Sequence, residues 1–127
     1  MPSESTARWP DTAAITVVIP TYNEADNLPG LVAELEALAI PTLCVLIVDD
    51  NSPDGTGKVA DELAQRFPGK IQVQHRLQKK GLGGAYLDGF CLALSSGADY
   101  VLQMDADFSP PPSVIPTMLA LMANYDV

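Results

Sequence analysis

Short apolar runs alternate with longer amphipathic stretches along most of this 127-residue chain. The stretches repeat apolar residues at intervals of three and four, which is the spacing of a helix that buries one face. The first two runs are almost wholly apolar, as is typical of strands buried on both faces of a parallel sheet. We therefore expect an α/β, Rossmann-like fold with helices on both faces of a mostly parallel sheet. The expected strands cover 15–19, 43–48, 71–73 and 100–104, and the expected helices cover 28–38, 59–67, 86–94 and 115–122.

The composition limits the class of protein. Hydrophobic residues make up 47% and charged residues 18%, which predicts one domain over residues 15–127 after a flexible tail at 1–14. No apolar run approaches the ~20 residues of a membrane span, and the N-terminus lacks a signal-peptide pattern. Cys44 and Cys91 lie in apolar runs, as expected for core residues in the reducing cytoplasm. The net charge of −9 argues against a nucleic-acid partner and suggests that some of the acid holds a cation.

Ligands of open parallel sheets bind beyond the carboxyl ends of the strands, so the residues that follow each strand are the candidates for a site. Pro20, Tyr22, Asn23 and Glu24 follow the first expected strand. An aromatic ring beside a carboxylate acceptor suits a nucleobase or a ribose. The same residues also fit a turn in which Asn23 caps the next helix, and the sequence leaves both interpretations open.

Two adjacent carboxylates, Asp49 and Asp50, end the second expected strand. Successive side chains of a strand point to opposite sides, so one can face a ligand while the other ties down a loop. The segment 52–56 that follows has the composition of a tight turn and a helix cap.

Basic residues and glycines follow the third expected strand, with His75 at its end. Arg76, Lys79 and Lys80 precede glycines at 81, 83 and 84, and a backbone rich in glycine can approach phosphates. The spacing fits neither a Walker loop nor a dinucleotide fingerprint, and a simple turn explains it equally well. We expect His75 to be a strand-end residue and not a ligand.

Asp105 and Asp107 follow the fourth expected strand and are the most specific local feature of the chain. Residues two apart in extended backbone project to the same side, where two carboxylates repel each other unless a cation or a proton lies between them. Mg²⁺ binds one or two carboxylates together with phosphate oxygens and water. The pair therefore predicts a divalent-cation site at the ligand edge of the sheet.

Four blocks stand in order along the chain, VVIPTYNEADNL, VDDNSPDGT, GLGGAYLDGF and MDADFSP. Together they resemble glycosyltransferase family 2, which has the GT-A fold, and more narrowly the dolichol- and polyprenol-phosphate mannose synthases. The resemblance implies transfer of a hexose, typically mannose from GDP-mannose, to a polyprenol or dolichol phosphate with inversion at the sugar carbon. It also implies Mg²⁺ or Mn²⁺ as cofactor, and peripheral contact with the cytoplasmic face of a membrane through the lipid acceptor.

The resemblance also implies roles for single residues. Asp105 and Asp107 would be the catalytic, metal-holding pair, with Asp107 as the direct ligand. Ser109 stands where some relatives have a further metal-binding Gln, and Lys80 receives no role. The implied nucleotide-sugar site comprises Pro20, Tyr22 and Glu24 at the nucleoside, Val48 and Asp50 at the base, and Asp105, Ala106 and Asp107 at the ribose and diphosphate.

Members of this family continue well past the position of Val127, and their acceptor site normally lies in that later part. We therefore expect this chain to be the nucleotide-binding portion of a longer domain. Two other hypotheses stay open. The chain could be a catalytically silent nucleotide-binding module, or part of a related transferase that uses UDP-glucose or another donor.

Overall fold

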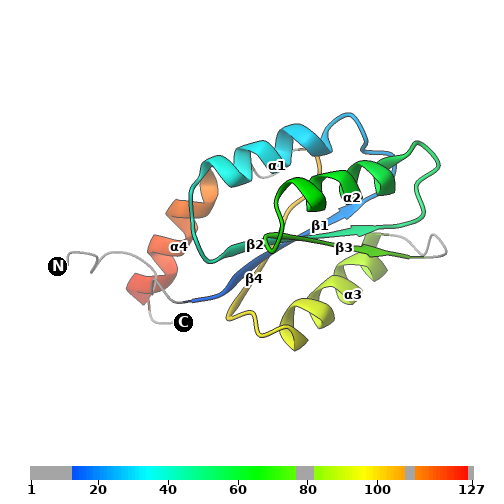
Figure 1. Ribbon diagram of the computed structural model, residues 1–127. Coiled ribbons are helices and arrows are strands. Elements are labelled where there is room, and N and C mark those ends of the chain that lie inside the picture. The colour runs from blue at the N-terminus through cyan, green and yellow to red at the C-terminus, as the bar shows by residue number, and fades with distance from the viewer. Residues whose placement is uncertain (1–12, 77–81, 108–110, 126–127) are drawn as a thin grey trace.

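The computed structural model describes residues 13–76, 82–107 and 111–125. Over these residues strands and helices alternate strictly, as the sequence predicts (Figure 1). Most of the tail expected at 1–14 lies outside the described residues. The elements are β1 (Ile15–Thr21), α1 (Leu28–Ala37), β2 (Leu43–Asp49), α2 (Thr56–Arg66), β3 (Ile71–His75), α3 (Leu82–Ser95), β4 (Tyr100–Gln103) and α4 (Val114–Tyr125).

The four described strands form one parallel sheet in the order β3-β2-β1-β4. Ile15 at the start of β1 pairs with Leu43 of β2 on one side and with Tyr100 of β4 on the other. The chain thus proceeds outward from β1 to β3 and then returns to the opposite side of β1. Such a reversal opens a crevice between the carboxyl ends of the two strands at which it occurs, here β1 and β4.

Helices cover both faces of the sheet, which confirms the prediction (Figure 1). Alternate side chains of the central strands point to opposite faces. Val17 of β1 packs with residues of α1, α2 and α4, whereas the next residue, Val18, packs with residues of α3. The largely apolar composition of β1 and β2 therefore follows from their burial on both faces.

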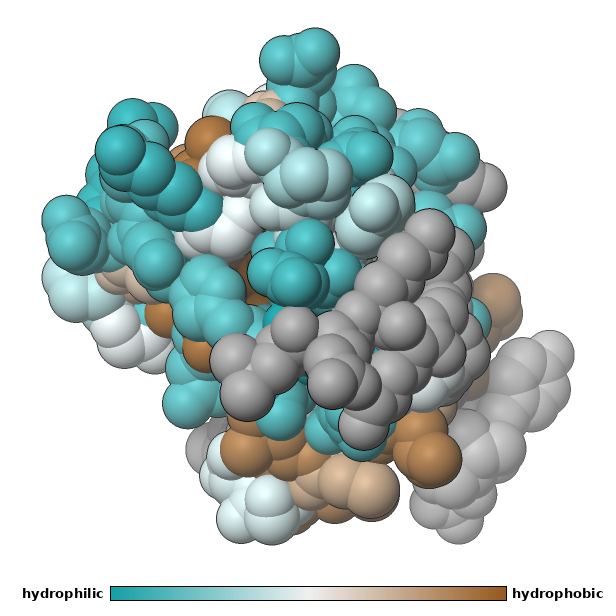
Figure 2. Space-filling model, turned by 90° about the vertical axis from the view of Figure 1, so that its right-hand side faces the viewer, coloured by the Kyte–Doolittle hydropathy of each residue, from teal (hydrophilic) through white to brown (hydrophobic). Residues whose placement is uncertain are grey.

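Helix α3 lies unusually close to the sheet. A methyl group added at Gly89 would lie 2.5 Å from Cγ1 of Val18 and 3.1 Å from Cγ2 of Val48, so only glycine fits without movement. The opposite side of α3 faces solvent, where Leu87 and Leu94 are 64% and 63% exposed. Hydrophobic atoms gather accordingly on the lower part of the surface in Figure 2, where α3 lies. No helix among the described residues is long and apolar enough to span a membrane.

Two local expectations differ from the structure. The glycine run does not form only a loop, because Gly83 and Gly84 belong to the first turn of α3. A methyl group added at Gly84 would lie 3.0 Å from Nη2 of Arg76, so glycine lets α3 begin close against this guanidinium. Helix α2 begins at Thr56, three residues earlier than the apolar spacing indicated, because the N–H of Thr56 donates to Oδ1 of Asp54 at 3.0 Å.

Candidate functional site

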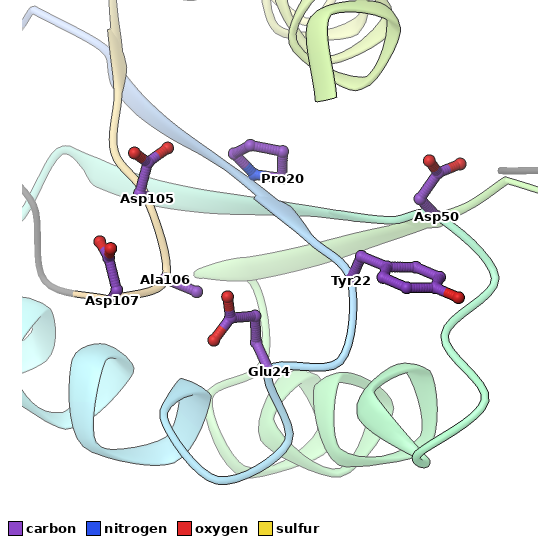
Figure 3. Close-up of a pocket in the computed structure, with 7 residues that line it drawn as sticks. All are labelled: Pro20, Tyr22, Glu24, Asp50, Asp105, Ala106 and Asp107. Atoms are coloured by element: carbon purple, nitrogen blue, oxygen red, sulfur yellow. The ribbon is translucent and has the colours of Figure 1, made fainter. Parts of the chain in front are cut away.

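A pocket of about 280 Å³ lies at the crevice between the carboxyl ends of β1 and β4. Residues at or just beyond the carboxyl ends of three different strands line it, and seven of the eight residues expected from the sequence are among them (Figure 3). The lining residues are Pro20, Tyr22, Glu24, Asp50, Asp105, Ala106 and Asp107. The sheet order brings these separate segments together, because β1 pairs with both β2 and β4.

Val48 is the expected site residue that does not line this pocket. Its side chain is fully buried in the cluster that joins the sheet to α3, and it lies close to Gly89. Asp50, two residues later, was expected beside it and does line the pocket. Four residues of the expected basic, glycine-rich and metal-binding segments lie outside the described residues, namely Lys79, Lys80, Gly81 and Ser109.

Asp49 ties down a loop, as predicted for one of the two adjacent carboxylates, and Asp50 is among the residues that line the pocket. The carboxylate of Asp49 accepts hydrogen bonds from Oγ1 of Thr21 at 2.8 Å and from the hydroxyl of Ser52 at 2.6 Å, so it ties the loop after β2 to β1. Asp50 is fully buried in the folded chain and is one of the residues that line the pocket. Nε of Arg76 lies 3.6 Å from its Oδ1, which places a buried cation behind this carboxylate.

The loop after β1 is held by side chains of the loop after β2. The N–H of Asn23 donates to Oγ of Ser52 at 3.0 Å, and the N–H of Glu24 donates to Oγ1 of Thr56 at 2.9 Å. Asp54 adds a third contact, because its Oδ2 accepts from the N–H of Ala25 at 3.3 Å. Segment 52–56 is therefore more than a turn and a cap, since it fixes the backbone that carries Glu24 into the pocket.

Asn23 does not cap the following helix, contrary to one of the two interpretations of its position. Helix α1 begins at Leu28 with Asn27 at the capping position, and Asn23 has a φ of 60°. Asn51, which follows β2, has a φ of 57°. Asparagine tolerates the left-handed region better than most residues, so each Asn turns the chain sharply as it leaves its strand.

Asp105 and Asp107 project to the same side of the chain, with Ala106 turned away between them (Figure 3). Asp105 is half-buried and Asp107 is exposed. Among the described residues the pocket is lined by four carboxylates and by no Lys or Arg. The same described residues contain no group of three or more His, Cys, Asp or Glu side chains placed to hold a metal ion. Two carboxylates fit a magnesium or manganese ion that takes its other ligands from water and a diphosphate.

Sequence reasoning missed two residues that support these carboxylates. The hydroxyl of Tyr86 in α3 donates a short hydrogen bond to Oδ1 of Asp105. Burial, and then the hydrogen bond to Asp105, raise the pKa of Tyr86 far above its ordinary value, so the hydroxyl keeps its proton as a donor. Arg76 lies between Asp50 and Asp88, with Nε 3.4 Å from Oδ2 of Asp88. Tyr86 stands at the start of an expected helix and Arg76 in a basic run, and neither pattern indicates a partner so distant in sequence.

Comparison with known proteins places these features in a family. The chain is 46% identical over 117 residues to a polyprenol monophosphomannose synthase from Mycolicibacterium smegmatis, covering 91% of this chain and 44% of that protein. It is 44% identical over 113 residues to an undecaprenyl-phosphate mannosyltransferase from Micrococcus luteus, covering 89% of this chain and 46% of that protein. The chain therefore spans less than half the length of these relatives.

A solved structure shares the fold. A mannosyltransferase from Pyrobaculum calidifontis, in complex with GDP-Man and Mn²⁺, superposes with a TM-score of 0.71 at 24% identity, over 89% of this chain and 34% of that one. Residues 16–127 match the sequence model of the family described as glycosyl transferase family 2. With its parallel GT-A-like sheet and these relatives, the chain belongs to glycosyl transferase family 2.

Proposed function

We propose that this chain binds GDP-mannose in the pocket between β1 and β4, and that the whole protein transfers the mannose to a polyprenol or dolichol phosphate. The observation that carries the proposal is the convergence of the expected nucleotide-sugar residues from three strand ends on one pocket. The names of the two curated relatives support the sugar and the class of lipid acceptor. The lipid acceptor would bring the protein to the cytoplasmic face of a membrane.

The charge of the pocket supports a divalent cation as cofactor. A nucleoside diphosphate is anionic, and carboxylates alone would repel it from a pocket lined by Glu24, Asp50, Asp105 and Asp107. We propose that Asp105 and Asp107 hold Mg²⁺ or Mn²⁺, with Asp107 as the more accessible ligand. When bound, the cation would offset the negative charge that develops on the departing diphosphate.

The remaining lining residues suit the nucleoside. Tyr22 offers its ring to the base, and Glu24 offers acceptor oxygens to ribose hydroxyls from a backbone that Thr56 holds in place. Asp50 would accept hydrogen bonds from the base. The bond between the sugar carbon and the diphosphate oxygen breaks as an oxygen of the acceptor phosphate attacks from the opposite face, which inverts the carbon. Because that acceptor is already an oxyanion, the chain needs no strong general base.

Binding of GDP-mannose tests the donor site. In isothermal titration we expect binding by the wild-type chain to strengthen at least tenfold when Mn²⁺ is added, and Asp107→Asn to lose this gain. Asp61→Asn, on an exposed part of α2, is the matched control and should behave as wild type. Equal binding by wild type and Asp107→Asn, with no effect of Mn²⁺, would refute the metal assignment.

Two further measurements separate the alternative functions. Competition of GDP and UDP against bound GDP-mannose decides between a guanosine donor and a uridine donor such as UDP-glucose. Transfer of labelled mannose to polyprenol phosphate by the full-length protein decides between an enzyme and a silent nucleotide-binding module. The silent module is supported if donor binds but no transfer is found.

A further inference from the structure

We propose that Tyr86 is a positioning residue for the cation site, and that it acts by fixing the carboxylate of Asp105. This inference rests on the proposed function, because it assumes that Asp105 helps to bind a divalent cation. It concerns α3, which contributes no residue to the described lining of the pocket.

The contact joins two elements that are distant in the chain. Tyr86 lies in the second turn of α3, whereas Asp105 follows β4 nineteen residues later. The hydroxyl of Tyr86 donates to Oδ1 of Asp105. The hydrogen bond thus occupies one carboxylate oxygen from the α3 side and leaves the other, Oδ2, available to a ligand in the pocket.

Tyr86 is itself held firmly, which a positioning role requires. Its ring packs against that of Phe90 one turn later in α3, with centroids 6.4 Å apart and an interplanar angle of 55°. The close approach of Gly89 to Val18 and Val48 fixes the depth of α3 against the sheet. The hydroxyl therefore reaches Asp105 from an element whose distance to the sheet is set by packing.

The chemical consequence follows from the charges. An unsupported pair of carboxylates repels and turns its side chains apart, and a neutral donor at one oxygen opposes this movement. Groups that hydrogen-bond a metal ligand from behind commonly change metal affinity by about 10- to 100-fold when they are removed. Tyr86 supplies such support to the less exposed member of the pair.

Manganese binding provides the test, measured as free Mn²⁺ by electron paramagnetic resonance in the presence of saturating GDP. Tyr86→Phe keeps the ring and removes the hydroxyl, and we expect it to weaken Mn²⁺ binding by about 10- to 100-fold. Tyr100→Phe in β4, at the opposite end of the strand from Asp105, is the matched control and should leave binding within twofold of wild type.

A double-mutant cycle distinguishes positioning from a general structural effect. In an Asp105→Ala background, Tyr86→Phe should cause less than a twofold further loss, because its only route to the cation has been removed. An equal loss in both backgrounds, or none in the wild-type background, would overturn the inference. If Asp107→Asn binds Mn²⁺ as wild type does, the proposed function fails instead; if Asp107→Asn weakens binding and Tyr86→Phe does not, only the role of Tyr86 fails.

A measurement on the unsubstituted side chain covers the case in which Tyr86→Phe does not fold. In chain labelled with ¹³C at tyrosine Cζ, the Tyr86 resonance should shift when Mg²⁺ and GDP are added. The shift should vanish in Asp105→Ala. A Tyr86 resonance that does not move on addition of Mg²⁺ and GDP to wild type would contradict the inference.

Discussion

Gly89→Ala is a sensitive test of how α3 is fixed against the sheet. In the structure the added methyl group would lie 2.5 Å from Cγ1 of Val18 and 3.1 Å from Cγ2 of Val48. Carbon atoms attract best at about 3.5–4.0 Å, so the nearer contact overlaps by roughly 1 Å. Val18 is β-branched and lies in β1, which has a neighbouring strand on each side, so its methyl group cannot easily turn away.

Two effects of opposite sign decide the magnitude. Alanine favours the interior of a helix over glycine by about 1 kcal/mol, and overpacking a well-packed core costs about 1–3 kcal/mol. Because the neighbouring strand cannot yield, we expect the upper part of the second range. Gly89→Ala should therefore lower the free energy of unfolding by about 2 kcal/mol.

Equilibrium unfolding in urea measures this change as a lower urea concentration at the midpoint, while the dependence of the free energy of unfolding on urea concentration stays unchanged. Val18→Ala provides the control, because removal of the Val18 methyl groups makes room for the new one. The double variant should be more stable than the sum of the two single losses predicts, by about 1 kcal/mol or more. If Gly89→Ala is neutral or stabilising, helix propensity outweighs packing and the close approach of α3 does not hold.

Two other predictions concern the ends of helices α1 and α2. Ala39, just after α1, has a φ of 56°. This conformation costs L-residues about 1–2 kcal/mol and costs glycine little. Ala39→Gly should therefore raise the free energy of unfolding by about 0.5–1 kcal/mol, and a lower midpoint of thermal or urea unfolding would contradict this. The hydroxyl of Thr56, followed by the backbone N–H groups of Thr56 and Ala25, holds the pKa of Asp54 below its ordinary value. Because the folded-state pKa is lowered, the contribution of Asp54 to stability is present above about pH 4 and is lost as the pH falls through that pKa. Carbon-13 NMR titration should show this lowered pKa in wild type and a rise toward the ordinary value in Thr56→Val, and a wild-type pKa at or above the ordinary value for Asp would disprove the reasoning.

Much of the fold could be predicted from the sequence because the signals are local. Buried parallel strands such as β2 need apolar side chains on both faces, and amphipathic helices such as α1 need a stripe on one. The predicted strand cores lie inside the observed strands except at Met104, which follows the end of β4. The start of α2 could not be predicted in this way, because Thr56 is placed by hydrogen bonds to Asp54 and to the loop after β1.

The residues of the candidate site could likewise be predicted only in part from the sequence. The residues beyond each strand end could be identified from the sequence, because an apolar run that is followed by charged residues is a local pattern along the chain. The absence of Val48 from the pocket lining could not, since it depends on how α3 packs over β2. The supports of Asp50 and Asp105 were also hidden, because Arg76 and Tyr86 reach them only after the strands have assembled.

Sequence alone accounts for the alternation of strands and helices, for the two apolar faces of the central strands and for the carboxylates that follow them. The position of β1 between β2 and β4, which brings residues 20–24 beside residues 105–107, is a property of the folded sheet. The two kinds of feature differ in the distance along the chain over which the responsible contacts act. Periodicity records what each segment must bury, whereas the order of strands, and with it the meeting of distant carboxylates, depends on packing among segments that are far apart in the chain.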